Sequence, residues 1–217
     1  MKELNLNSKF IQSLNALTDL LLLNLLWMLT SMPIVTAGAS TAAVYGVLDR
    51  LDRRECDGVV RCYFGCWLGV WKQAGLFGLI QLLFTGLLLN NFLTMYCQPN
   101  RVAVLLAWLS LIELIILCGV FTLIYPLLAR DQNRFADQLR NAALLFRANV
   151  ARVLLQLLLL ALPAAMAFFL TELFLRTLPF WVLFGFSALF RLCHGLQRPI
   201  FRAFEPEQSQ NEDVEIQ

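Results

Sequence analysis

Long apolar segments separated by short charged ones are the main pattern of this chain. Five apolar segments reach the length of about 20 residues that a helix needs to cross the hydrocarbon core of a bilayer. They cover residues 10–32, 74–97, 102–128, 153–171 and 177–196. A sixth apolar segment, 34–48, is rich in small residues and too short for an ordinary span. The pattern predicts an all-α, polytopic transmembrane helical bundle with five clear spans plus a short sixth membrane segment.

Two further segments have the apolar spacing of amphipathic helices, and each comes just before a span. Their apolar positions recur every three to four residues, which is the period of an α-helix. In the first segment they are Val60, Phe64, Trp67, Trp71 and Ala74. In the second they are Phe135, Leu139, Ala142, Phe146 and Val150. We expect both segments to form interfacial amphipathic helices, since tryptophan favours that depth.

Segments 57–128 and 132–203 share one order of elements, an amphipathic helix followed by two spans. At an offset of 75 residues, Gln81 of the first aligns with Gln156 of the second. This match indicates a tandem repeat of the kind that some transporters contain. Chance matching in a leucine-rich sequence is the alternative.

The composition places the chain in a bilayer. Hydrophobic residues make up 59% and charged residues 15%, and the mean hydropathy is +0.67, whereas soluble domains average about 45–50% and 25%. We expect a single integral membrane domain, 1–203, and a disordered acidic tail, 204–217. The basic residues form no face with interleaved aromatics, so we expect the lipid bilayer and no nucleic acid as a partner.

Basic residues gather in particular connections, and this predicts the sidedness of the chain. Loops 49–72 and 129–152 carry five basic residues each, whereas the connections near 98–101 and 172–176 carry one each. The positive-inside rule therefore places both basic loops and the C-terminus in the cytoplasm. If 34–48 returns the chain to the side it came from, the N-terminus is cytoplasmic, with 15 basic residues inside and 2 outside. If it stays in the cytoplasm, the division is 13 to 4, so the first arrangement is favoured.

The stretch SMPIVTAGAST, residues 31–41, interrupts the apolar pattern with small and hydroxylated residues. A signal-peptide cleavage site, an extramembrane linker and a turn that folds the chain back would each explain it. Asn24 lies in the preceding apolar segment, where a signal peptide should be purely apolar. Pro33 disfavours a helical residue before it, Gly38 permits close backbone approach, and Thr36 can satisfy free backbone groups. We therefore predict a fold-back whose topology turn contains these three residues.

One carboxylate lies near the middle of a predicted span. Glu113 stands about 17 Å along the segment 102–128, at 1.5 Å per residue, where a charged side chain costs about 2.5–3.5 kcal/mol on insertion scales. Facing the interior, it would bind a cation, a proton or a polar substrate, with Asn24, Gln81 and Gln156 as candidate partners. The alternative is a protonated Glu113 that is hydrogen-bonded to a neighbouring helix.

Sequence patterns of enzymes and metal proteins are absent. The chain contains no HExxH, GxSxG or GxxxxGK[ST] motif. Cys62 and Cys66 lie one helical turn apart near Cys56, but no histidine is near them and zinc sites usually need four ligands. His194 lies at the end of the last span without an evident metal-binding neighbour. We expect no catalytic residues, no metal and no cofactor, and therefore no enzyme.

The segment 19–45, DLLLLNLLWMLTSMPIVTAGASTAAVY, resembles the signature of the YesL-like family, bacterial membrane proteins of unknown function. The matching residues are Asp19-Leu20, Asn24-Leu25-Leu26-Trp27, Ser31, Pro33-Ile34-Val35-Thr36, Gly38-Ala39-Ser40, Ala43 and Tyr45. A later block, Trp71-Lys72-Gln73-Ala74, is similar to a second and looser family pattern. The resemblance implies a location in the bacterial cell membrane. Members often occur beside genes for carbohydrate-uptake ABC transporters, which implies an accessory role in sugar transport or its regulation.

Two classes of function follow from these observations. The first is a non-enzymatic accessory or regulatory protein that docks with an ABC transporter permease or a sensor kinase through its amphipathic helices and small-residue faces. The alternative is a small secondary transporter or channel that uses the intramembrane Glu113. The sequence does not predict an oligomeric state.

Overall fold

The computed structural model describes the backbone of residues 2–98, 100–130 and 134–215, and the side chains within 14–98, 100–130 and 134–201. These residues form helices joined by short connections, and no strand occurs among them. The helices are α1 (Lys2–Ser31), α2 (Ala37–Arg53), α3 (Val59–Tyr96), α4 (Arg101–Arg130), α5 (Phe135–Ala148), α6 (Val150–Phe169), α7 (Thr171–Phe180) and α8 (Phe186–Glu215). A 3-10 turn, Ile34–Thr36, precedes α2, and a π-helical turn, Trp181–Gly185, precedes α8. The all-α prediction is therefore confirmed.

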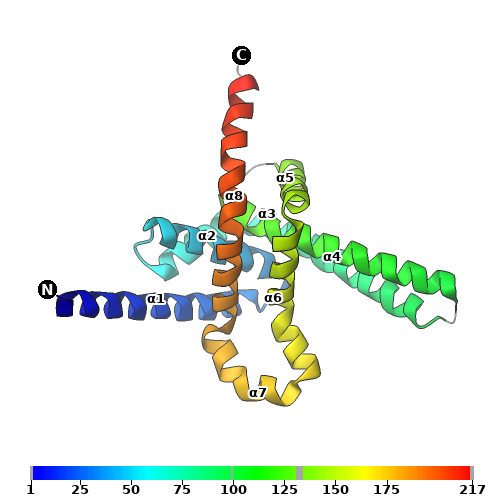
Figure 1. Cartoon of the computed structure of the whole chain (residues 1–217), viewed down its shortest axis with the longest axis horizontal. Coiled ribbons are helices and arrows are strands. Elements are labelled where there is room, and N and C mark those ends of the chain that lie inside the picture. Colours follow the sequence, from blue (N-terminus) through cyan, green and yellow to red (C-terminus); the bar gives the residue numbers. More distant parts are fainter. Residues whose placement is uncertain (1, 99, 131–133, 216–217) are drawn as a thin grey trace.

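Helix α2, which contains the short sixth membrane segment, is the centre of the fold. Every residue from Gly38 to Leu48 except Thr41 is buried. The helix packs against α3 most extensively and also contacts α1, α4 and α8 (Figure 1). Its small residues explain this position, because they let neighbouring helices approach closely without the mismatch that bulky side chains would cause.

The closest helix crossing joins α2 and α3 at two glycines. A Cβ on Gly38 would lie 3.1 Å from the Cα of Gly78 and would overlap the carbonyl oxygen of Ala74. A Cβ on Gly78 would lie 3.2 Å from the Cα of Gly38. Neither position has room for a side chain while the other backbone stays in place. The predicted close approach at Gly38 therefore has a definite partner on α3.

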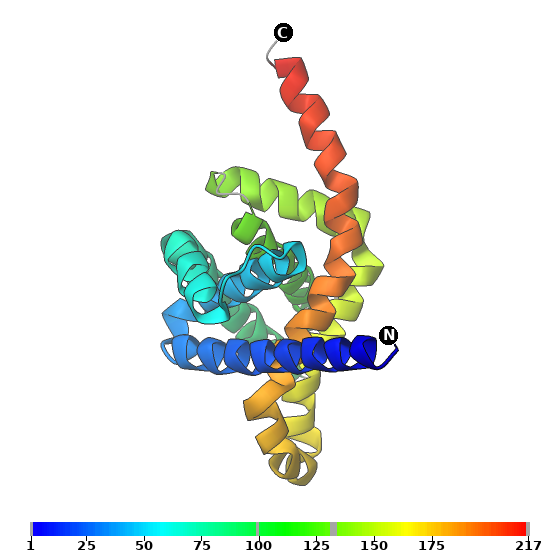
Figure 2. The same cartoon turned by 90° about the vertical axis from the view of Figure 1, so that its left-hand side faces the viewer.

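The chain reverses direction between α1 and α2. Helix α1 ends at Ser31, and Pro33 adopts an extended conformation before the 3-10 turn. The Oγ1 of Thr36 lies 2.6 Å from the carbonyl oxygen of Thr30 and 2.8 Å from that of Pro33, so it bonds to carbonyl groups freed at the helix end. Helix α2 then runs back along α1 in both views (Figures 1 and 2). The segment is thus a fold-back, not an extended linker.

Helices α3 and α4 form a long antiparallel hairpin. The predicted interfacial segment and the following span are one continuous helix, the 38-residue α3. No proline separates the two parts, so the hydrogen-bonded helix continues through both. The buried face of its first half contains Val59, Tyr63, Cys66 and Val70. In the predicted amphipathic stripe, Val60, Phe64 and Trp71 are exposed, whereas Trp67 is half-buried and Ala74 is buried.

The second half of the chain is more segmented. Helix α5 is a separate amphipathic helix, as the sequence predicts, and it ends at Ala148, with one residue between it and the start of α6. Helices α6, α7 and α8 form an arm that runs crosswise to the α3–α4 hairpin (Figure 1). Helix α8 extends to Glu215 and so includes most of the predicted acidic tail, 204–217, whose disorder stays a prediction. Glutamate and glutamine are good helix formers, which favours this continuation. The side chains beyond residue 201 lie outside the described part.

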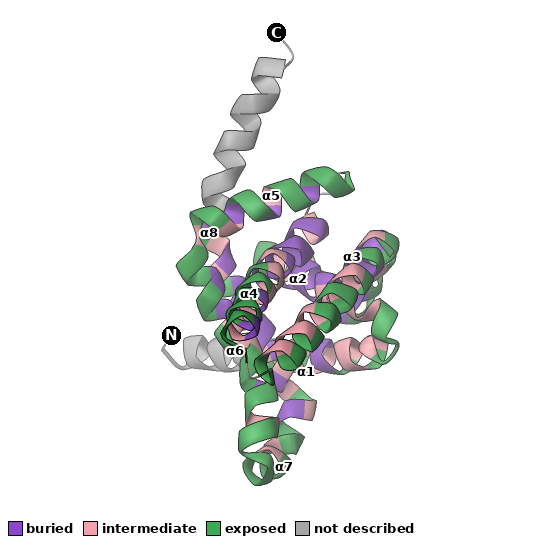
Figure 3. Cartoon of the chain, turned by 90° about the vertical axis from the view of Figure 1, so that its right-hand side faces the viewer, coloured by how far each residue is buried: buried purple, intermediate pink, exposed green. Residues whose placement is uncertain are grey.

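Much of the apolar surface is not covered by the chain itself. Five helical segments within the described residues are long and apolar enough to cross a membrane. Between 6% and 28% of the most apolar part of each is buried inside the structure. Buried residues gather on α2 and on the faces turned toward it, while outer faces are exposed (Figure 3). This combination is that of a membrane protein, since lipid can cover such faces and water cannot.

Candidate functional site

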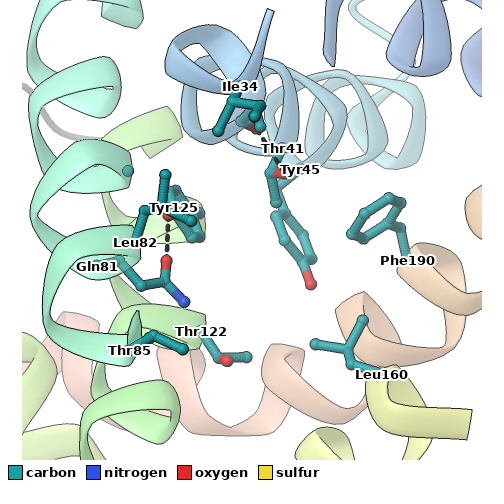
Figure 4. Close-up of a pocket in the computed structure, with 12 residues that line it drawn as sticks. Ile34, Thr41, Tyr45, Gln81, Leu82, Thr85, Thr122, Tyr125, Leu160 and Phe190 are labelled. Atoms are coloured by element: carbon teal, nitrogen blue, oxygen red, sulfur yellow. Dashed lines mark hydrogen bonds between the residues drawn. The ribbon is translucent and has the colours of Figure 1, made fainter. Parts of the chain in front are cut away.

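A pocket of about 360 Å³ lies beneath the first half of α2, where α2, α3, α4, α6 and α8 meet (Figure 4). Its volume is in the range of small-molecule sites, about 300–1,000 Å³. The residues that line it are Ile34, Ala37, Thr41, Tyr45, Gly78, Gln81, Leu82, Thr85, Thr122, Tyr125, Leu160 and Phe190. None of these side chains carries a formal charge at neutral pH. The pocket is therefore a neutral site that combines hydroxyl, amide and aromatic groups.

Two glutamine–tyrosine pairs flank this pocket. The hydroxyl of Tyr125 on α4 donates a short hydrogen bond to the Oε1 of Gln81 on α3. The Nε2 of Gln156 on α6 lies 3.4 Å from the hydroxyl oxygen of Tyr45 on α2. Gln81 and Gln156 are the residues that align in the predicted repeat, and each contacts a tyrosine that lines the pocket. Two of the four predicted site residues are thus brought to one site.

The pairs leave hydrogen-bonding capacity turned toward the pocket. Because the Oε1 of Gln81 accepts from Tyr125, its Nε2 is free to donate, and it points into the cavity in Figure 4. Tyr45 also points its hydroxyl inward. Its ring meets the ring of Phe190 edge-on, with centroids 5.7 Å apart, and forms an apolar wall. Donors and an aromatic surface therefore face one space.

Buried amides behind Tyr45 support this wall. Gln156 and Gln197 are 1% and 0% exposed, and the Oε1 of each has no hydrogen-bond partner among the described residues. The Nε2 of Gln197 lies 3.4 Å from the carbonyl oxygen of Thr122, another pocket residue. Buried polar atoms without partners are uncommon in folded proteins because their desolvation is not compensated. Neither amide lines the pocket itself, but each contacts a residue that does.

A charged cluster forms a second polar region at the C-terminal end of α2. Asp52 pairs with Arg191 on α8 at 2.7 Å and also with Arg198 on the same helix. Asp49 pairs with Arg130, the last residue of α4, at 2.8 Å. Two carboxylates from α2 thus connect that helix to the ends of α4 and α8. The sequence analysis did not single them out, although their spacing of three places them on one face of the helix.

His194 belongs to the same cluster. Its side chain is 4% exposed, and its Nε2 lies 3.0 Å from the Oδ2 of Asp52. The sequence analysis placed it at the end of the last span, whereas it lies inside α8, and did not identify this partner. No group of three or more potential metal ligands occurs in the described ranges. The six cysteines are free thiols.

Asn24 has a structural role in α1 and does not line the pocket. It is fully buried, and its Nδ2 donates to the carbonyl oxygens of Trp181 at 3.2 Å and Val182 at 2.6 Å. Its Oδ1 accepts from the backbone N–H of Ser187 at 2.8 Å. The side chain thereby satisfies backbone groups in and after the π-helical turn, where the regular α-helical ladder is interrupted.

Glu113 lies apart from the three amides. It is exposed on α4, in the part of the hairpin that extends away from the core. Among the described residues it has no hydrogen bond or ion pair with Asn24, Gln81 or Gln156. The candidate ligand set proposed from the sequence is therefore split: two amides at the pocket, one at the π-helical turn, and the carboxylate on an outer face.

The family comparison covers the elements that form the turn and the core. Residues 20–92 match the family described as protein of unknown function, DUF624. This is the YesL-like family, so the match confirms the resemblance carried by residues 19–45. Neither a curated protein nor a solved structure matches the chain. The matched region contains α2, the Gly38–Gly78 crossing and the pocket residues from Ile34 to Thr85, so it includes two thirds of the residues that line the pocket.

Proposed function

We propose that this chain, a YesL-like membrane protein through its residues 20–92, is a non-enzymatic accessory protein of carbohydrate ABC transport in the bacterial cell membrane. It docks with a permease helix through the outer face of the α3–α4 hairpin. The family resemblance supports the transport context, and the placement of Glu113 supports the docking face. The basic loops 49–72 and 129–152 and both termini face the cytoplasm in this proposal.

The main support for this docking surface is the carboxylate of Glu113, which lies within an apolar stripe of α4. On α4, Leu105, Leu109, Ile112 and Ile116 are exposed large apolar residues at helical spacing, and Glu113 lies among them. A helix face of this kind is typical of contact with lipid or with another apolar helix. The carboxylate distinguishes the two, because lipid offers it no hydrogen-bond donor.

The energetic argument favours a protein partner. Placing a charged side chain at the middle of a membrane helix costs about 2.5–3.5 kcal/mol, whereas a charge-assisted hydrogen bond returns about 1.5–3 kcal/mol. Glu113 lies far from both ends of α4, so a short side chain cannot reach either interface. A permease helix that presents a lysine, arginine or other donor at this depth would satisfy the carboxylate. The proposed partner is therefore an apolar helix that carries a hydrogen-bond donor.

Co-purification tests this proposal. Tagged protein is extracted from bacterial membranes in a mild detergent, and associated ABC permease subunits or sensor kinases are identified by mass spectrometry. We expect a permease in the parent sample and about a tenfold loss with Glu113→Leu, corresponding to about 1.4 kcal/mol. Glu172→Gln on the exposed face of α7 is the matched control and should keep the partner.

Two outcomes would overturn the proposal. The parent protein recovering neither a permease nor a sensor kinase would contradict the accessory role. Equal recovery of the permease by the parent protein and by Glu113→Leu would contradict docking through this surface. The transporter alternative predicts a different result: Glu113→Gln would abolish substrate flux in reconstituted vesicles while partner recovery stayed intact.

A further inference from the structure

We infer that the pocket beneath α2 binds a small uncharged molecule that carries several hydroxyl groups. The inference is independent of the docking face, because Glu113 does not line the pocket. It rests on three properties of the wall: the absence of charge, the distribution of donors and acceptors, and the aromatic surface.

The absence of charge excludes ionic ligands. All twelve lining side chains are neutral at physiological pH. The pocket lies between apolar helices, where a charged ligand would lose hydration without gaining an opposite charge. The carboxylates of α2, Asp49 and Asp52, lie at the other end of that helix, where they pair with Arg130 and Arg191. A neutral ligand avoids this desolvation cost.

Both hydrogen-bond donors and acceptors line the pocket. The Nε2 of Gln81 supplies a donor. The hydroxyl of Thr122 already donates to the carbonyl oxygen of Cys118 at 2.7 Å, so its oxygen remains an acceptor. Thr41 donates to the carbonyl oxygen of Ala37 at 2.8 Å and accepts from the Nε1 of Trp27 at 3.3 Å, so its oxygen keeps one further acceptor position. A hydroxyl group both donates and accepts, so a molecule with several of them fits such a mixed wall better than one that only accepts.

The aromatic surface complements the carbon skeleton of such a molecule. Tyr45 and Phe190 meet edge-on and, with Leu160, border the space opposite Gln81 (Figure 4). C–H groups of a polyol can pack on these rings while its hydroxyls reach the polar side. The same chemistry occurs in a free sugar and in the neutral head group of a glycolipid. The experiment therefore uses one probe for a free sugar and another for a glycolipid head group.

Ligand binding is measured on full-length protein purified in a detergent without a sugar head group. Glucose is the soluble probe, and octyl glucoside below its critical micelle concentration is the lipid-like probe. Thermal shift and isothermal titration should show saturable binding of at least one. Glucose 6-phosphate and glucosamine, which are charged analogues, should bind at least tenfold more weakly. Preference for the glucoside would identify a lipid head group as the source, and preference for glucose a free sugar.

Variants locate the binding in the pocket. Gln81→Leu and Tyr45→Phe should each weaken binding about three- to tenfold, the effect of one lost neutral hydrogen bond. Tyr96→Phe and Gln98→Leu, at the exposed end of the α3–α4 hairpin, are the matched controls. Leu82→Trp fills the pocket from a residue that is 52% exposed, so it should block binding even if the polar variants fold poorly.

Three results would overturn the inference. They are the absence of binding by both neutral probes, equal affinity for charged and neutral probes, and unchanged affinity in Leu82→Trp. None of them depends on recovery of a permease, so the pocket and the docking face can fail separately.

Discussion

At the residue scale, side chains with similar chemistry have different roles because of their neighbours. Asn24 and Gln81 are both amides in apolar helices and are equivalent by sequence criteria. In the structure, Asn24 is fully used by three backbone groups, whereas Gln81 bonds to one tyrosine and keeps its donor free. The number of partners separates a structural amide from a candidate binding amide, and this number cannot be read from the sequence.

Replacement of Asn24 tests its structural role. Asn24→Leu keeps the approximate volume but removes two bonds to the carbonyl oxygens of Trp181 and Val182 and one from the N–H of Ser187. We expect a loss of about 2 kcal/mol in the free energy of unfolding, since hydrogen bonds in membrane proteins average about 0.6 kcal/mol and unsatisfied buried groups add to that. Thermal unfolding in detergent measures the change. Asn90→Leu, exposed on α3, serves as the control, and equal stability of the two variants would contradict this role.

At the element scale, hydropathy predicted the helices better than their boundaries and contacts. The apolar segments, the separate amphipathic helix α5 and the reversal at Pro33 follow from local patterns. The continuity of α3 and the π-helical turn do not, because no local signal marks them. The charged cluster was also missed: Asp49 and Asp52 appear as loop charges until α2, α4 and α8 bring their partners together. Periodicity identifies a helix face but not the helix that it contacts.

The Asp52 pairs should hold the C-terminal end of α2 against α8. Asp52→Asn removes the negative charge that faces Arg191, Arg198 and His194, and we expect a loss of about 1–2 kcal/mol because these pairs are only partly exposed. Separation of the helices should expose Cys193, which is fully buried in the structure. The rate at which a maleimide labels Cys193 in a variant without the other cysteines measures this effect.

Asp57→Asn provides the comparison for the cluster. Asp57 is exposed in the connection after α2 and forms no ion pair among the described residues. Its replacement should leave the labelling rate of Cys193 unchanged. If Asp52→Asn behaves in the same way, the cluster does not hold the two helices together.

At the scale of the whole molecule, the side of the membrane that each connection faces can be tested by experiment. The structure shows that α2 returns along α1 and that α3 and α4 form a hairpin whose turn contains Cys97 (Figure 1). Charge counts place that turn outside the cell and the connection between α2 and α3 inside. The two connections are therefore expected on opposite sides of the membrane, and cysteine labelling distinguishes them.

A membrane-impermeant maleimide should label Cys97 in intact cells, because this thiol is exposed at the hairpin turn. Arg54→Cys, in a background without other cysteines, should react only after permeabilisation.

The natural Cys56 is a poor reporter for the cytoplasmic side, since partial burial raises the pKa of its thiol to about 11. Near pH 7 its thiolate fraction is then about a hundredfold below that of a thiol with a pKa of 9. Its labelling should consequently accelerate as the pH rises toward that value. Labelling of Arg54→Cys in intact cells, or protection of Cys97 until permeabilisation, would contradict the orientation predicted for the basic loops.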